Sequence, residues 1–182
     1  MSSVILITTS LRAGSNSDRL ADEVERGAKD AGCDVVRVSL KGKEIKFCKG
    51  CLACQKTQRC VIKDDAVEIA AQIGNADALV FFTPIYYYEM SGQMKTLLDR
   101  CNPLYTSDYK FRKVYLVTTA AEDDDRAPEK AIAGLQGWID CFEKATLAGT
   151  LFCGGVNDAK EVEKYAGKLT EAYNFGRNLN QH

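Results

Sequence analysis

The sequence has little of several residue types that would point to particular functions. Its one histidine is His182, so an imidazole acid or base has no part in the expected chemistry. The 24 lysines and arginines nearly balance 25 acids, which leaves no electrostatic reason to expect nucleic acid or an anionic membrane as partner. No apolar run approaches the roughly 20 residues that a membrane-spanning helix needs.

The chain also lacks linkers and repeats. No stretch rich in proline, glycine or serine divides its 182 residues, so we expect residues 1–182 to form a single domain. The first ten residues carry no positive charge and only a short apolar run, so we expect no signal peptide and a cytoplasmic protein. In that compartment cysteines more often bind metal or act in catalysis than form structural disulfides.

Strand-like and helix-like patterns alternate along the sequence. Buried, mostly β-branched or aromatic runs predict strands at residues 4–9, 33–40, 78–84, 113–121 and 145–155. Apolar residues at helical spacing predict a helix after the first strand and further helices at residues 64–77, 91–101, 128–142 and 158–179. This alternation predicts the α/β class, with a doubly wound five-stranded parallel sheet in the flavodoxin-like strand order 2-1-3-4-5.

The loop after the first predicted strand has the groups that a phosphate needs. In such a sheet a ligand binds beyond the carboxyl ends of the strands. This loop has hydroxyls at Ser10, Ser15 and Ser17, the amide of Asn16 and the guanidinium of Arg12, directly before a helix start. The dinucleotide and P-loop fingerprints are absent, so we predict a site for a single phosphate; the alternative is a capping turn.

Two further loops have features that suit a planar ring. Three tyrosines follow Pro84 directly after the third strand, and a flat ligand needs aromatic or apolar walls. The alternative is that these tyrosines pack in the core or in an interface. After the fourth strand, Thr118–Ala121 are small enough for a ring to approach the backbone.

Four motifs in this order resemble the NADPH-dependent FMN reductase and iron–sulfur flavoprotein superfamily. They are TSLRAGSNSDRL, CKGCLACQKTQRCVIKDD, ADALVFFTPIYYYEMSGQMKTLLDR and VTTA, and they cover residues 1 to about 120. The resemblance implies a flavodoxin-like FMN-binding domain in which hydride passes from NAD(P)H through FMN to a small acceptor. It also implies a homodimer or homotetramer with FMN near a subunit interface.

The resemblance implies FMN-binding residues in three loops and no catalytic residue, because the flavin carries the chemistry. These residues are Ser10, Arg12, Ser15, Asn16, Ser17, Pro84, Ile85, Tyr86, Tyr87, Thr118, Thr119 and Ala120. A recurring S-x-x-x-K motif is matched by Ser91 and Lys95. A non-catalytic flavodoxin-type electron carrier is a further alternative, but such carriers are usually strongly acidic.

Half of the eight cysteines, Cys48, Cys51, Cys54 and Cys60, have the spacing C-x2-C-x2-C-x5-C. This spacing resembles the motif of iron–sulfur flavoproteins, which bind a [4Fe–4S] cluster and exchange electrons with ferredoxin-like partners. Plain flavin reductases with a similar loop keep free thiols instead. Zinc is the least favoured alternative, because zinc sites usually pair two separated C-x2-C units.

Overall fold

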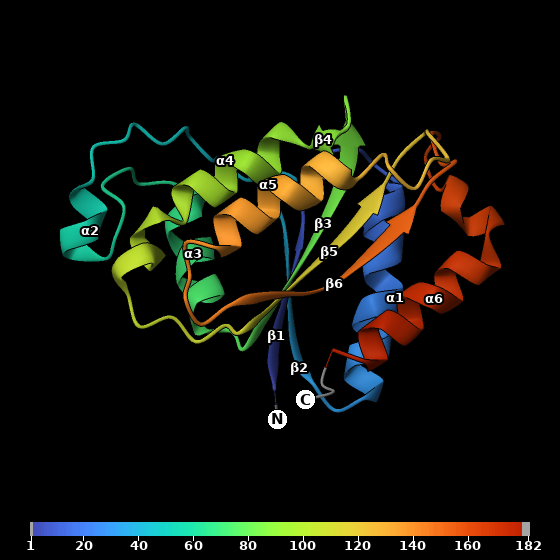
Figure 1. Cartoon of the computed structure of the whole chain (residues 1–182), viewed down its shortest axis with the longest axis horizontal. Coiled ribbons are helices and arrows are strands. Elements are labelled where there is room, and N and C mark those ends of the chain that lie inside the picture. Colours follow the sequence, from blue (N-terminus) through green and yellow to red (C-terminus); the bar gives the residue numbers. More distant parts are fainter. Residues whose placement is uncertain (1, 180–182) are drawn as a thin grey trace.

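A computed structural model, which describes residues 2–179, has a parallel sheet at its centre (Figure 1). The parallel strands are β1 (Ser3–Thr8), β2 (Asp34–Ser39), β3 (Ala78–Tyr86), β5 (Lys113–Thr119) and β6 (Thr146–Cys153). They lie in the order β2-β1-β3-β5-β6. Counted among the parallel strands alone, this order is 2-1-3-4-5, so the predicted fold class is confirmed.

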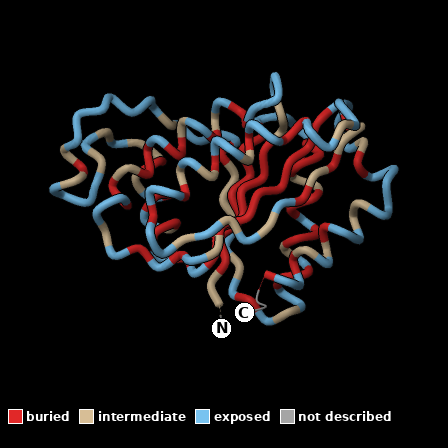
Figure 2. The backbone as a smooth tube through the Cα atoms, in the orientation of Figure 1, coloured by how far each residue is buried: buried red, intermediate tan, exposed pale blue. Residues whose placement is uncertain are grey.

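Helices cover both faces of the sheet (Figure 1). The α-helices are α1 (Asn16–Asp30), α2 (Ala53–Thr57), α3 (Asp65–Asn75), α4 (Gly92–Arg100), α5 (Glu129–Ile139) and α6 (Ala166–Arg177), and the 3-10 helices are η1 (Asn102–Thr106) and η2 (Glu161–Lys164). Residues of α1 and α6 share one core cluster with Val4 and Leu6, whereas α3, α4 and α5 share the other with Ile5 and Ile7. Both faces of β1 are therefore buried, as Figure 2 shows for the central strands, and this explains its continuous apolar run.

One strand was not predicted from the sequence. The two-residue β4 (Glu89–Met90) pairs antiparallel with the end of β3, which makes the sheet six-stranded rather than five-stranded. Tyr87 and Tyr88 form the turn between them, and both have left-handed φ angles, 51° and 64°. Such turns usually contain glycine or asparagine, so two tyrosines give no sequence signal for a hairpin.

The last predicted helix begins later than expected. The backbone of Lys160 is left-handed, the short η2 follows, and α6 starts only at Ala166. Apolar spacing in the predicted helix at residues 158–179 places Val162 and Ala166 on its inner face; Val162 is buried, whereas Ala166 is exposed. The cysteine-rich segment contains the short α2, which lies at the outer edge of the molecule (Figure 1). None of the helices within residues 2–179 is long and apolar enough to cross a membrane.

Candidate functional site

Four loops at the carboxyl ends of β1, β3, β5 and β6 enclose a cleft of about 140 Å³. Its lining residues are Ser10, Arg12, Ser15, Asn16, Pro84, Ile85, Tyr86, Thr119, Ala120, Ala121, Val156 and Asn157. Ten of these twelve are residues singled out from the sequence, nine as implied FMN-binding residues and Ala121 as a small residue beside the ring. The described lining contains one cation and no carboxylate, so the chemistry of its donor set suits an anionic group.

The loop before α1 has several features that suit an anionic group. Gly14 has a left-handed φ of 65°, which glycine adopts without strain, and the chain then enters α1 at Asn16. Ser15 caps this helix, since its hydroxyl accepts a hydrogen bond from the Asp18 amide and lies 2.8 Å from the Ser17 hydroxyl. Because the first amides of a helix have no partner inside it, those of Asn16 and Ser17 remain available beside these hydroxyls.

The segment after β6 anchors this loop. The Arg12 guanidinium donates to the Asn157 carbonyl. The Asn16 side chain donates to the Asp158 carbonyl at 2.9 Å and accepts from the Val162 amide at 3.0 Å. Both hydrogen-bonding atoms of the Asn16 side chain therefore link the loop before α1 to the segment after β6.

Sequence reasoning missed two lining residues, Val156 and Asn157. Ala121 belongs to the small segment Thr118–Ala121 that was expected beside a ring, although the implied FMN-binding set ended at Ala120. Val156 and Asn157 follow Gly154 and Gly155 at the end of β6, where no role was assigned. The sequence could have indicated these two residues, because the carboxyl ends of all parallel strands in an open α/β sheet lie at the same edge, so the loop after β6 reaches the cleft as well.

Three residues that the resemblance implied lie outside the cleft lining. Ser17 is fully buried behind Ser15. Thr118 is buried, and its hydroxyl donates to the Leu151 carbonyl at 3.4 Å. Tyr87 is 99% exposed at the tip of the β3–β4 turn, so within one chain it contacts no ring. Their assignment as FMN ligands stays a prediction.

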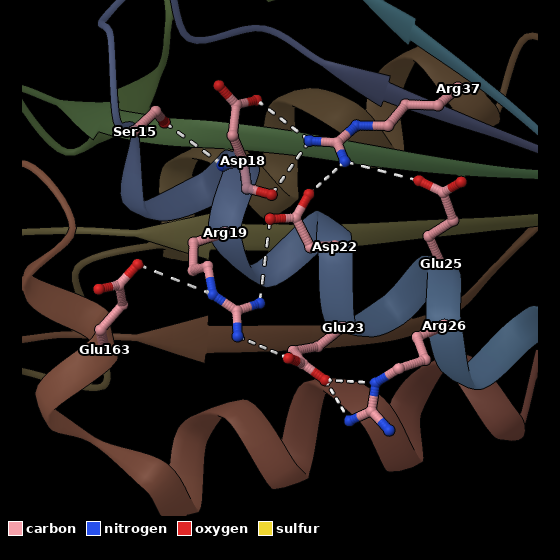
Figure 3. Close-up of polar contacts among 9 residues, drawn as sticks. All are labelled: Ser15, Asp18, Arg19, Asp22, Glu23, Glu25, Arg26, Arg37 and Glu163. Carbon is pink, nitrogen blue, oxygen red and sulfur yellow. Dashed lines mark hydrogen bonds and ion pairs between the residues drawn. The ribbon is translucent and has the colours of Figure 1, made fainter.

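A network of ion pairs covers the outer face of α1, the helix that begins at the cleft (Figure 3). Its charged members are Asp18, Arg19, Asp22, Glu23, Glu25, Arg26, Arg37 and Glu163. Burial raises the pKa of Glu23, but hydrogen bonds from Arg26 and Arg19 outweigh it and hold that pKa below its usual value. The network ties α1 to β2 through Arg37 and to η2 through Glu163.

The cysteine loop, residues 47–63, lies outside this cleft. Cys48 and Cys51 are exposed, Cys54 is buried and Cys60 is half-buried, and none forms a disulfide. Within residues 2–179, no three potential ligands converge on a common point. Four thiols are nevertheless a complete donor set for a cubane cluster, so the loop fits such a group in chemistry but not in this conformation.

A larger cavity of about 450 Å³ is lined in part by Leu11, which belongs to the loop before α1. Its walls are mostly apolar and also include Leu40, Ile45 and Phe47. Its one cation, Lys43, lies 3.3 Å from the Asp65 carboxylate. This cavity brings together no set of reactive groups.

Comparison with solved structures supports the fold. A NAD(P)H:quinone oxidoreductase from Methanothermobacter marburgensis aligns with a TM-score of 0.72 at 18% identity, over 100% of this chain and 98% of that one. An azoreductase from Bacillus anthracis aligns with the same TM-score at 16% identity, over 98% of this chain and 100% of that one. At such identities the likeness concerns the fold alone.

Curated relatives are more similar in sequence. An iron-sulfur flavoprotein of Archaeoglobus fulgidus is 32% identical over 97 residues, which cover 53% of this chain and 44% of that protein. An iron-sulfur flavoprotein of Methanosarcina thermophila is 27% identical over 158 residues, which cover 85% of this chain and 83% of that protein. The chain thus spans less than half of the first relative and most of the second.

The sequence also matches the family described as NADPH-dependent FMN reductase, over residues 2–136. This match contains β1 to β5 and therefore three of the four loops that enclose the cleft. The chain belongs to the NADPH-dependent FMN reductase family.

Proposed function

We propose that this chain is an FMN-dependent NAD(P)H oxidoreductase that binds FMN in the cleft. The observation that carries this proposal is the cleft itself, which brings loops from four strand ends together around one cation and several hydroxyls. The FMN phosphate lies in the loop from Ser10 to Ser17, and the flavin ring lies against Pro84–Tyr86 and Thr119–Ala120. We further propose that residues 1–182 act as one domain in a homodimer or homotetramer.

The roles of the protein groups follow from their chemistry. FMN, when bound, supplies the hydride chemistry between NAD(P)H and a small acceptor. Arg12 offsets the phosphate charge, and the amides at the start of α1 donate to its oxygens. Pro84 and Tyr86 form an apolar wall, while the small Ala120 lets the ring approach the backbone.

The test of this proposal is FMN binding by Arg12→Met. Loss of a charge-assisted contact should weaken FMN binding by about tenfold or more, measured by quenching of flavin fluorescence. Arg126→Met is the matched control, since Arg126 is exposed, pairs with Asp124 and lies outside the cleft lining. Equal FMN affinity in Arg12→Met and the parent would refute the phosphate assignment. NAD(P)H oxidation with a quinone acceptor then separates an enzyme from a flavodoxin-type carrier.

A second candidate function is that of an iron–sulfur flavoprotein. Two observations favour it: the C-x2-C-x2-C-x5-C spacing, and the similarity to two relatives that are iron-sulfur flavoproteins. Cys48, Cys51, Cys54 and Cys60 would bind a [4Fe–4S] cluster, which exchanges single electrons. Lysines and arginines surround the loop and would offset the cluster charge; they are Lys46, Lys49, Lys56, Arg59 and Lys63.

Iron counted on protein purified without oxygen tests this second candidate. About four irons per chain would support a cubane cluster, and Cys51→Ser should then lower iron while FMN stays bound. Cys141→Ser is the control, because Cys141 is also exposed but lies at the end of α5. If the parent protein contains a full complement of FMN but no iron, the second candidate function is refuted and the four cysteines are free thiols.

A further inference from the structure

A single buried ion pair closes the base of the cysteine loop. The Arg100 guanidinium contacts the Asp64 carboxylate through two hydrogen bonds, Nη1 to Oδ2 at 2.6 Å and Nη2 to Oδ1 at 2.8 Å. Neither side chain is exposed to solvent. A two-point contact of this kind fixes orientation as well as distance.

The same guanidinium holds both ends of the loop. Nη1 of Arg100 donates to the Lys46 carbonyl at 2.7 Å, and Nη2 donates to the Ile62 carbonyl at 3.3 Å. The Asp64 carboxylate also accepts from the Lys46 amide at 2.8 Å. Residues 46 and 62 are thereby fixed to one point at the end of α4. The buried Nε of Arg100 has no hydrogen-bond partner among the described residues.

Two of the four cysteines lie near the end of α4 and the start of η1. Cys60 and Arg100 line the same cavity of about 150 Å³. The pKa of Arg100 is raised, chiefly by its hydrogen bonds to Asp64 and further by the nearby Cys60 side chain. Asn102, the first residue of η1, donates to the Cys54 sulfur at 3.2 Å.

Cys54 is held in a second way as well. It belongs to α2, which docks on η1 through hydrogen bonds from Gln58 to the Thr106 carbonyl at 3.1 Å and from Thr106 to the Gln55 carbonyl at 3.1 Å. Cys48 and Cys51 are exposed, and the Cys48 sulfur accepts a hydrogen bond only from within the loop among residues 2–179, from the Gly50 amide at 3.4 Å. The four thiols are therefore divided into an anchored pair and an exposed pair.

We propose that Arg100 and Asn102 are positioning residues for the sulfur atoms of Cys60 and Cys54. They hold half of the four-cysteine set in place, and Cys48 and Cys51 complete the donor set. This inference rests on the second candidate function, in which the four thiols bind an iron–sulfur cluster. Hydrogen bonds to ligand sulfur help to set the reduction potential of such a cluster, and ligands fixed by their surroundings bind it more readily.

The first test needs no iron. FMN-loaded, iron-free protein is treated with iodoacetamide, and alkylation of each cysteine is followed by mass spectrometry. In Arg100→Met, Asp64 is left buried and unpaired, so Cys54 and Cys60 should react faster by about tenfold or more. Arg100→Lys should restore part of the protection, and Asn102→Ala should speed Cys54 alone. Rates at Cys54 and Cys60 equal to those of the parent would overturn the proposal.

Two controls separate a local effect from general unfolding. Cys101 follows Arg100 directly and is fully buried in the core, so it must stay unreactive in a folded variant. Arg112→Met is the matched arginine control, because Arg112 also donates to backbone carbonyls, those of Lys110 and Phe111, far along the chain from the loop. If Arg100→Met exposes Cys101 as well, Asn102→Ala alone decides the outcome.

The second test measures iron per chain and the reduction potential after anaerobic reconstitution. Lower iron or a shifted potential in Arg100→Met and Asn102→Ala, with unchanged FMN content, supports the proposal. Parent and variants with equal iron and equal potential would refute the positioning role and leave the iron–sulfur function intact. If the parent itself binds no iron, the second candidate function fails, and the alkylation rates still decide whether the two residues position the sulfur atoms.

Discussion

The Ser91 hydroxyl lies 3.0 Å from that of Thr9, and both are fully buried. The Thr83 hydroxyl donates to the same Ser91 oxygen at 3.1 Å, and the Met94 amide donates to it at 3.4 Å. One oxygen thus joins the end of β1, the end of β3 and the start of α4, directly beside the loops that form the cleft. Ser91 caps α4, and its link to both strands leaves no signal in the sequence pattern.

We predict that Ser91→Ala lowers both stability and FMN affinity. Loss of the cap and of two buried hydroxyl contacts should reduce the free energy of unfolding by about 2–3 kcal/mol. Urea unfolding with and without FMN checks this. Thr96→Ala is the control on the same helix, since the Thr96 hydroxyl donates to the Gly92 carbonyl within α4. A loss in Thr96→Ala as large as that in Ser91→Ala would contradict the prediction.

The contact between α1 and α6 depends on two glycines. A Cβ atom on Gly27 would lie 2.0 Å from the Tyr173 carbonyl oxygen, and one on Gly176 would lie 2.1 Å from that of Val24. Backbone cannot move aside as a flexible side chain can, so Gly27→Ala should destabilise the fold by about 3 kcal/mol. Gly137→Ala is the control.

Gly137 lies on the exposed side of α5 with nothing within 4 Å of its would-be Cβ. In a helix interior, alanine there should stabilise the protein by about 0.5–1 kcal/mol. Urea denaturation of both variants measures the difference. If Gly27→Ala and Gly137→Ala change the free energy of unfolding in the same direction, α1 and α6 are not in direct backbone contact.

The buried Asp64 predicts a specific dependence of stability on pH. Burial alone raises the pKa of Asp64, but hydrogen bonds from Arg100 and from the Lys46 amide outweigh it and hold that pKa below its usual value. Because the folded pKa lies below the unfolded one, the ion pair stabilises the fold fully above about pH 4. Its contribution is lost as the pH falls through the depressed pKa.

The comparison of the parent with Asp64→Asn isolates this effect. The unfolded chain has an aspartate pKa of roughly 3.9, so Asp64 is ionised in both states from about pH 5 to 7 and the difference in free energy of unfolding should be constant there. Below about pH 4 the difference should shrink. Urea unfolding at several pH values measures it. A difference that stays constant down to about pH 2 would show that the pKa of Asp64 is the same in the folded and unfolded states.

Local patterns predicted the parts of the fold that depend on local chemistry. The buried run in β1 and the apolar stripe of α1 follow from periodicity, and the topology then placed Ser10 and Pro84 at one edge of the sheet. Contacts between distant residues leave no such pattern. Asn16 meets Val162, and Asp64 meets Arg100, only because the chain folds back on itself, so neither pair could be read from spacing.

The turn at Tyr87 and Tyr88 gives the last prediction. A non-glycine residue in the left-handed region costs about 1–2 kcal/mol, and Tyr87 gains no contact in return within one chain, since it is 99% exposed. Tyr87→Gly should therefore leave the free energy of unfolding unchanged or raise it by up to about 1 kcal/mol, as relief of strain exceeds the entropy cost of glycine.

The proposed oligomer implies that Tyr87 covers the flavin of a second copy. In that case Tyr87→Gly should weaken FMN binding without lowering the free energy of unfolding. Urea unfolding and FMN titration at two protein concentrations measure both quantities. Tyr105→Gly is the control, because Tyr105 is about half exposed but is not among the residues with a left-handed backbone. Tyr87→Gly with unchanged FMN affinity at both concentrations would exclude Tyr87 from the flavin site, and the strained turn would then need another explanation.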